Sequence, residues 1–173
     1  MSIIDHDDLY QEVFRRLGMF GSHQRAEPLL RELQALKSPE AFWRVMQECW
    51  TSCDDTWSLR DKFLRLLGSR GVIPAHLMTP ENRAFYDSLP DRIKIYRGCS
   101  KGRAKGLSWT TDKSIAIGFA RGHRSIAVPS PVLCRAVVRK DRGFFFFATN
   151  EREEKELVVD TRLRALRVEM TAL

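Results

Sequence analysis

Residues 144–160 read FFFFATNEREEKELVVD and set a cluster of glutamates directly against a Leu-Val-Val run. The four phenylalanines and the Leu-Val-Val run are typical of two short strands, and the polar residues between them are typical of a turn. One interpretation is that the glutamates are only solvated in that turn. The other is that a pair of carboxylates is held at the entrance of a strand to do chemistry. The rest of the sequence has to decide between the two.

The length and composition fit one folded domain, or one domain with a helical extension. The 173 residues are 43% hydrophobic and 10% aromatic, which is enough to bury a core. No apolar run approaches the roughly 20 residues of a transmembrane helix. The N-terminus MSIIDHDDLY also lacks the basic and then apolar order of a signal peptide. We therefore expect a soluble protein of the cytoplasm with no membrane partner.

The cysteines and histidines show no metal-ligand spacing. Cys49 and Cys53 are spaced to share a helical face, but no second Cys or His pair accompanies them as in a zinc finger. Cys99 and Cys134 stand far from both. We expect all four to be small buried apolar residues and predict no metal site.

The net charge of +7 favours an anionic partner without identifying one. Lysines and arginines are scattered along the chain, with no block of five or six, and no nucleic-acid-binding signature is present. The charge is compatible with an acidic macromolecule or with a small polyanion such as a dinucleotide.

The first half of the chain is predicted to be helical. Apolar residues recur at helical spacing in residues 3–17, 29–36, 39–53 and 57–67. Ser38 is a predicted N-cap with Pro39 at the first helical position, and Thr79-Pro80 repeats this pattern. We expect the helix at 57–67 to end at Gly68.

The second half changes to short strands. β-branched or alternating segments predict strands at residues 92–98, 132–140, 144–148, 156–160 and 164–170. A short helix capped by Thr111 or Asp112 is predicted within residues 110–120. The change near Leu89–Pro90 divides the chain into a helical region, residues 1–89, and a β-rich core, residues 90–173. The predicted fold class is therefore α+β.

Three elements of the β-rich core could carry chemistry, in the order Arg, Ser, Glu. Residues 96–98, Tyr-Arg-Gly, end a strand, and residues 108–110, Ser-Trp-Thr, lead into the short helix. Residues 154–156, Glu-Lys-Glu, open the strand Leu-Val-Val. Residues two apart in a strand point to the same face, so Glu154 and Glu156 can enter one site. Taken alone, the elements are also compatible with a surface arginine, a helix cap and a solvated loop.

Together they resemble the Arg–Ser–Glu class of the ADP-ribosyltransferase superfamily, which includes cholera-toxin-like and clostridial toxin-like enzymes. The family pattern is an aromatic-Arg pair ending the first strand, a Ser-Thr-Ser-like motif, a helix ending in Phe-Ala, and Glu-x-Glu opening another strand. The corresponding stretches are Tyr96-Arg97, Ser108-Trp109-Thr110, Phe119-Ala120 and Glu154-Lys155-Glu156. The resemblance covers about residues 92–160. Trp109 departs from it, because it stands where the family has a hydroxyl residue.

The resemblance implies a split β-sandwich with an NAD cleft, preceded by the N-terminal helical region, part of which packs on the sandwich. It implies a mono-ADP-ribosyltransferase that cleaves NAD and modifies a target protein. The resemblance further implies an effector of bacterial or bacteriophage origin with toxin-like action. Such an effector would act in the cytoplasm, including that of a host.

The resemblance also implies a role for each matched residue. Glu156 stabilises the positive charge that develops on the ribose, Arg97 binds the NAD phosphates, and Ser108 orients Glu156 or the ribose. Glu154 acts on the acceptor, and glutamate at this position goes with transfer to arginine. Residues 151–156 contain four glutamates, and Glu151-Arg152-Glu153 is a second Glu-x-Glu motif among them. We prefer the pair that leads straight into the strand.

The remaining matched residues, Tyr96, Gly98 and Thr110, are expected around the NAD. Nicotinamide is flat and cationic in NAD, so an aromatic wall would suit it. Trp109, Phe119 and one of the phenylalanines at 144–147 are candidates for that wall, and each is equally compatible with a place in the core.

Three other functions stay open at this stage. An NAD glycohydrolase would use the same residues with water as acceptor, and a nucleic-acid-directed relative would make use of the basic charge. A non-enzymatic helical interaction module would need none of these residues. Arg97 and Glu156 on opposite sides of the fold would exclude the catalytic interpretation.

Overall fold

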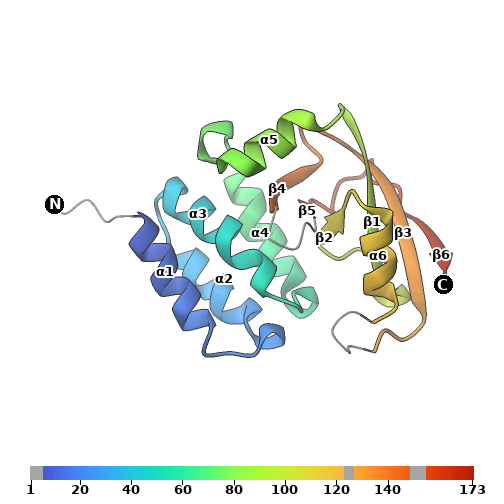
Figure 1. Ribbon diagram of the computed structural model, residues 1–173, viewed down its shortest axis with the longest axis horizontal. Coiled ribbons are helices and arrows are strands. Elements are labelled where there is room, and N and C mark those ends of the chain that lie inside the picture. The colour runs from blue at the N-terminus through green and yellow to red at the C-terminus, as the bar shows by residue number, and fades with distance from the viewer. Residues whose placement is uncertain (1–5, 123–126, 149–154) are drawn as a thin grey trace. The chain divides into compact units, whose positions relative to one another are not determined.

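The structure is a computed structural model that describes residues 6–122, 127–148 and 155–173. These residues form six α-helices and a six-stranded antiparallel sheet, which confirms the predicted α+β class (Figure 1). The chain divides into two compact units, Met1–Pro80 and Glu81–Leu173. None of the described helices combines the length and apolar character needed to cross a membrane.

The first unit consists of helices and short 3₁₀ turns. Its α-helices are α1 (His6–Leu17), α2 (Ala26–Ala35), α3 (Pro39–Cys49) and α4 (Arg60–Arg70). Each turns an apolar stripe inward, as the helical spacing of these residues requires. The buried side chains include Val13, Leu29, Leu33, Phe42, Met46, Trp50, Phe63 and Leu67.

The start of α3 has the predicted cap, whereas the end of α4 differs from the sequence-based prediction. Ser38 caps α3 by accepting a hydrogen bond from the Ala41 amide at 3.2 Å, and Pro39 occupies the first turn. The prediction that α4 ends at Gly68 is wrong, because the helix continues to Arg70 and ends at Gly71. Gly71 has φ +78°, which favours glycine, whereas an exposed glycine inside a helix costs only about 1 kcal/mol.

The second unit contains the sheet. It begins with α5 (Pro80–Ser88), and its other helix, α6 (Lys113–Ala120), follows the second strand. The strands are β1 (Arg92–Ser100), β2 (Ser108–Thr110), β3 (Pro131–Arg139), β4 (Phe144–Ala148), β5 (Glu156–Val159) and β6 (Glu169–Ala172). Their order across the sheet is β4-β5-β2-β1-β3-β6 (Figure 1).

The last strand starts later than the sequence pattern at residues 164–170 predicts. Residues 164–168 are not in a strand, and β6 starts only at Glu169. The chain turns first, because the amides of Leu163 and Leu166 donate to the carbonyls of Asp160 and Leu163. Residues in this turn cannot also pair as part of the strand.

Strands β1 and β3 separate a buried face from an exposed one. Register pairs Ile93 with Val138 and Ile95 with Ala136, and all four residues are buried. The alternate residues of both strands point the other way. On that side the exposed residues include Arg92, Lys94, Arg135 and Arg139.

Strand β4 is buried on both faces. Phe144 to Phe147 are all at most 4% exposed, and a bulge interrupts the pairing with β5 between Phe144 and Phe146. Two aromatic residues of α5 pack against this strand. Phe85 and Tyr86 each lie 5.7 Å from Phe147 between ring centroids. An unbroken run of phenylalanines is therefore expected, because none of these four residues faces water.

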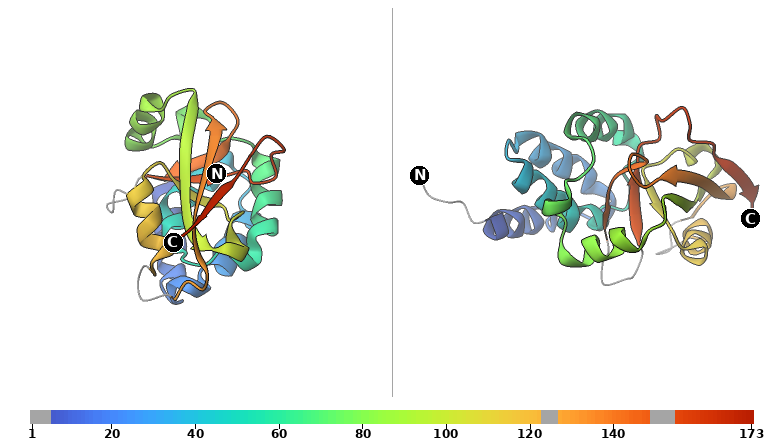
Figure 2. Two further views of the ribbon diagram at one scale, coloured as in Figure 1. Left: turned by 90° about the vertical axis from the view of Figure 1, so that its right-hand side faces the viewer. Right: turned by 90° about the horizontal axis from the view of Figure 1, so that it is seen from above.

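Helix α6 packs beside β1 (Figure 1 and Figure 2), and the contact is at Gly98, near the end of this strand. A Cβ atom at this position would overlap the Ala116 carbonyl oxygen and approach the Ala120 amide nitrogen to 2.6 Å. Both atoms belong to the helix backbone, so neither can move aside without shifting α6. Only glycine allows this close approach of helix and strand.

We predict that Gly98→Ala destabilises the second unit by about 1–3 kcal/mol or more, since overpacking against backbone cannot be relieved by a rotamer change. Gly118→Ala in α6 is the matched control. A Cβ at Gly118 would meet no described atom within 4 Å, so this variant should be neutral or gain up to about 1 kcal/mol. Urea unfolding of both variants measures the difference, and equal midpoints would contradict the packing described here.

Candidate functional site

Strand β2 brings the three motifs onto neighbouring strands. It has only three residues and lies between β1 and β5. Thr110 is paired with Tyr96 of β1 on one side and with Glu156 of β5 on the other. Residues far apart in the sequence thus form one row across the sheet.

The row Tyr96–Thr110–Glu156 has its side chains on one face. Directly opposed residues of antiparallel strands share a face, with Cβ atoms about 4.5–5.5 Å apart. Ser108 lies two residues before Thr110 and therefore points to the same face, next to Val158. Ser108 and Glu156 are half-buried, whereas Thr110 is only 6% exposed. The pairing thus places Thr110 directly opposite the half-buried carboxylate of Glu156 and Ser108 diagonally from it, both on the neighbouring strand.

Arg97 approaches this row from a different direction. It follows Tyr96 in β1 and is paired with Cys134, so strand alternation starts its side chain on the opposite face. Its guanidinium donates from Nη1 to the Ser108 carbonyl at 2.7 Å and from Nε to the Arg103 carbonyl at 3.2 Å. Strand carbonyls point along the plane of a sheet, so the guanidinium lies beside β2 rather than far out on the other face.

Arg97 lies where β1 and β2 separate, and we call this place the junction of the two strands. The two strands share the single pair Tyr96–Thr110, and beyond it β1 is paired with β3 alone. Residues 101–107 return the chain to β2, and Trp109 donates its indole N–H to the Gly106 carbonyl at 2.9 Å. A Cβ on Gly106 would overlap the Arg97 guanidinium and lie 2.8 Å from its Nε. Arg97 and Glu156 thus start from opposite faces of the sheet, an arrangement that counts against the catalytic interpretation, and they can act on one molecule only if it spans this junction.

Two thiols lie on the Arg97 side of β1. The sulfur atoms of Cys99 and Cys134 are 3.9 Å apart, and both residues are buried. The hydrogen bond from the Cys134 thiol lowers the pKa of Cys99 to about 6, against the opposing effect of burial, and the positive charge of Arg97 adds to the lowering. The same shared proton, together with burial, raises the pKa of Cys134.

This thiol pair was not found from the sequence. The prediction of four buried cysteines is correct for Cys49, Cys99 and Cys134 and wrong for the half-buried Cys53, and it did not include the contact between Cys99 and Cys134. The only available signal was that Cys99 stands two residues after Arg97 and so shares its face of β1. Its partner comes from β3, 35 positions along the chain, which spacing alone cannot reveal.

The start of α6 fixes the other end of β2. The Thr110 hydroxyl accepts a hydrogen bond from the Asp112 amide at 3.0 Å, and Asp112 caps the helix by accepting from the amides of Ser114 and Ile115. The hydrogen bond from the Ser114 hydroxyl is the largest cause of the lowered pKa of Asp112, and the charge of Lys155 contributes. Thr110 therefore has a structural role in addition to its place in the row.

Lys155, directly before Glu156, has a left-handed backbone. Its φ is +43°, a conformation that few residues other than glycine adopt and that costs of the order of 1–3 kcal/mol. Backbone strain of this kind is concentrated at functional sites. It sets the direction in which the chain enters β5 at Glu156.

The remaining predicted site residues have mixed positions. Trp109 is 2% exposed and occupies a core position, whereas Phe119 on α6 is 36% exposed. Gly98 is covered by α6. Glu154 lies outside the described residues, as do Glu151 and Glu153, so the structure does not choose between the two Glu-x-Glu pairs.

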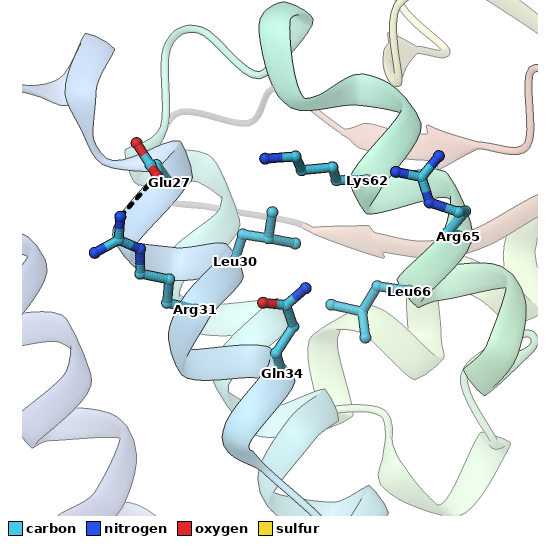
Figure 3. Close-up of a pocket in the computed structure, with 7 residues that line it drawn as sticks. All are labelled: Glu27, Leu30, Arg31, Gln34, Lys62, Arg65 and Leu66. Atoms are coloured by element: carbon cyan, nitrogen blue, oxygen red, sulfur yellow. Dashed lines mark hydrogen bonds and ion pairs between the residues drawn. The ribbon is translucent and has the colours of Figure 1, made fainter.

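A cavity of about 500 Å³ lies elsewhere, between α2 and α4 of the first unit (Figure 3). Its lining comprises Glu27, Leu30, Arg31, Gln34, Lys62, Arg65 and Leu66. Arg31 is paired with Glu27 at 2.8 Å, and no residue of the three motifs borders this cavity. It is open and cationic, but it is not the site that the sequence predicts.

Comparison of the chain with protein-family models, with curated proteins and with solved structures found no match.

We predict that one thiol of the folded protein titrates with a midpoint near pH 6. The pKa of Cys99 is depressed in the folded state from an ordinary value of 9.0, so the unfolded chain binds the extra proton between these values. The free energy of unfolding should therefore rise with pH from about 6 to 9 and lose this contribution below pH 6.

Thiolate absorbance in the ultraviolet measures this titration. Cys99→Ser should abolish the low-pH step and the matching pH dependence of stability. Cys53→Ser, which removes a half-buried thiol of the other unit, should leave both unchanged. A wild-type protein without thiolate at pH 7.5 would contradict the proposed charge state.

Proposed function

We propose that this protein is a mono-ADP-ribosyltransferase that cleaves NAD and transfers ADP-ribose to an arginine of a protein acceptor. The observation that carries the proposal is the position of β2. This strand sets Ser108 and Thr110 beside Glu156, while the Arg97 guanidinium contacts the backbone of Ser108. The Arg, Ser and Glu elements that resemble the family are thereby neighbours in space.

The reaction places a specific demand on Glu156. The bond between the nicotinamide nitrogen and ribose C1′ breaks, the electron pair leaves with nicotinamide, and positive charge develops on the ribose. A fixed carboxylate beside the sugar stabilises this charge, as in glycoside hydrolysis. Glu156 is half-buried at the entrance of a strand, where partial exclusion of water strengthens such an interaction.

The acceptor step completes the reaction. A guanidinium nitrogen of the acceptor attacks C1′ and loses a proton, for which Glu154 is the proposed base. Arg97 is the proposed ligand of the NAD phosphates, where a planar guanidinium makes paired, charge-assisted hydrogen bonds. Its two backbone carbonyl partners orient the guanidinium before any substrate is bound.

The finer fold is part of the same proposal. We take the second unit to be an ADP-ribosyltransferase-like split β-sandwich with its NAD cleft at the junction of β1 and β2. The single residue pair between these strands supports this assignment, because a sheet that parts after one pair is opened at that point.

We predict that Glu156→Gln lowers the rate of nicotinamide release from NAD by about 10²–10⁴-fold, because it removes the charge and keeps the shape. Glu169→Gln is the matched control. Glu169 is an exposed residue of β6, where it pairs with Arg135 of β3, and three strands separate β6 from β5. Loss of its charge should change the rate little. Equal rates for all three proteins would exclude the assigned role of Glu156.

The acceptor is tested in the same assay with labelled NAD. Polyarginine should become labelled and polylysine should not. Nicotinamide release without labelling of either polymer or of cell extract would show hydrolysis instead of transfer. No release from the wild-type protein with extract present would contradict the proposal as a whole.

We predict that Gly106→Ala weakens NAD binding by displacing the Arg97 guanidinium, the end of a flexible side chain that can move without unfolding the protein. A loss of at least tenfold in affinity is expected. Gly102→Ala in the same loop is the control, since a Cβ there would meet no described atom within 4 Å. Isothermal titration of NAD into both variants gives the comparison, and equal affinities would show that the position of Arg97 does not matter.

A further inference from the structure

The positive charge of the protein is confined to its second unit. Residues 81–173 contain 19 lysines and arginines against 11 aspartates and glutamates, a formal charge of +8. Residues 1–80 contain 10 against 11, a formal charge of −1. Although lysines and arginines are scattered along the sequence, the two units therefore differ strongly in net charge.

Part of this charge lies on the exposed side chains of β1 and β3. Arg92 and Lys94 of β1 and Arg135 and Arg139 of β3 are all exposed and, by strand alternation, point to the same side. We call these four residues the cationic face. Arg92 is directly opposite Arg139 in the register, a like-charge arrangement that destabilises a sheet.

Neighbouring carboxylates neutralise this face only in part. Arg139 is paired with Asp141 at 2.9 Å and Arg135 with Glu169 at 3.4 Å. Within the described ranges, no ion pair is formed by Arg92 or Lys94. Of the two opposed arginines, Arg139 therefore has a carboxylate partner, whereas the charges of Arg92 and Lys94 can bind an anion from outside.

We propose that the cationic face binds a single strand of nucleic acid. Tyr96 lies on the same side, opposite Arg135, and is half-buried, so it offers a ring edge or face among the cations. Cations that follow a phosphate backbone, combined with an aromatic residue, are the usual means of binding unpaired strands. Tyr96 also belongs to the row that leads to Glu156, so a bound strand would pass beside the candidate site.

The form of the surface favours an unpaired strand over other anions. β1 and β3 are interior strands of the sheet, between β2 and β6, and only an α-helix or a narrow β-ribbon fits the major groove of a duplex. An acidic protein surface is less suitable, because protein interfaces have an apolar core. Tyr96 and Val137 offer half-buried apolar surface between the four cations, and α6 covers the neighbouring end of the face at Gly98.

Binding of a labelled single-stranded DNA oligonucleotide, measured by fluorescence anisotropy without NAD, tests the proposal. With four phosphate contacts, affinity should fall about 50-fold between 50 mM and 200 mM salt, a slope near −2.8. The double variant Arg92→Ala/Lys94→Ala should bind more weakly and reduce this fall to about sevenfold, a slope near −1.4. The absence of NAD keeps the result independent of the proposed enzymatic function.

The matched control is Lys62→Ala/Arg65→Ala, which removes the same charge from the exposed side of α4 in the other unit (Figure 3). It should bind as the wild-type protein does, and thermal melting confirms that both variants are folded. The proposal is overturned by absence of binding at 50 mM salt or by equal losses in both double variants. It is also overturned by duplex binding as tight as single-strand binding, or by binding of polyglutamate in place of DNA.

Discussion

The register that joins Tyr96, Thr110 and Glu156 is the constraint on which the candidate site depends. A strand of three residues has few ladder hydrogen bonds, so β2 needs other contacts to stay between β1 and β5. Trp109 supplies one of them through its buried ring and its bond to Gly106. The Val159 amide adds another by donating to the Leu107 carbonyl at 2.9 Å. The tryptophan that departs from the family motif is therefore what anchors the strand carrying that motif.

Placing the charge of Arg97 beside β2 costs folding free energy. The side chain starts from the core side of β1, where an unpaired charge would be strongly unfavourable. Two backbone carbonyls offset this cost by accepting hydrogen bonds from the guanidinium, and its positive charge lowers the pKa of the nearby Cys99 thiol. Such a group is not retained for stability alone, since an apolar residue would fill the same space more favourably. This is the physical reason for linking it to an anionic substrate.

Much of the fold could be predicted, because its signals are local. Ser38-Pro39 marks the start of α3, and the alternation of Ile93 and Ile95 identifies β1 with its buried face. The end of α4 and the bounds of β6 could not be predicted, because they depend on a backbone angle at Gly71 and on a turn before Glu169.

The sequence supplied a list of candidate residues for the site but not their geometry. Sequence order indicated which strands carry the motifs, whereas the register between strands is set by non-local packing. For that reason the placement of Arg97 at a strand junction, and its contact with a thiol pair from β1 and β3, could not be foreseen. The opposed arginines of the cationic face were hidden for the same reason, because Arg92 and Arg139 are 47 positions apart in the chain.

The most direct test of the account is an NMR titration of the isotope-labelled protein with NAD, read residue by residue. We expect amide shifts at Arg97 and Gly98 on β1, at residues 108–110 on β2 and at Glu156 on β5, because the proposed NAD site spans the junction of β1 and β2. Shifts on one side of the junction only, shifts confined to the cavity between α2 and α4, or no shifts at millimolar NAD would contradict it.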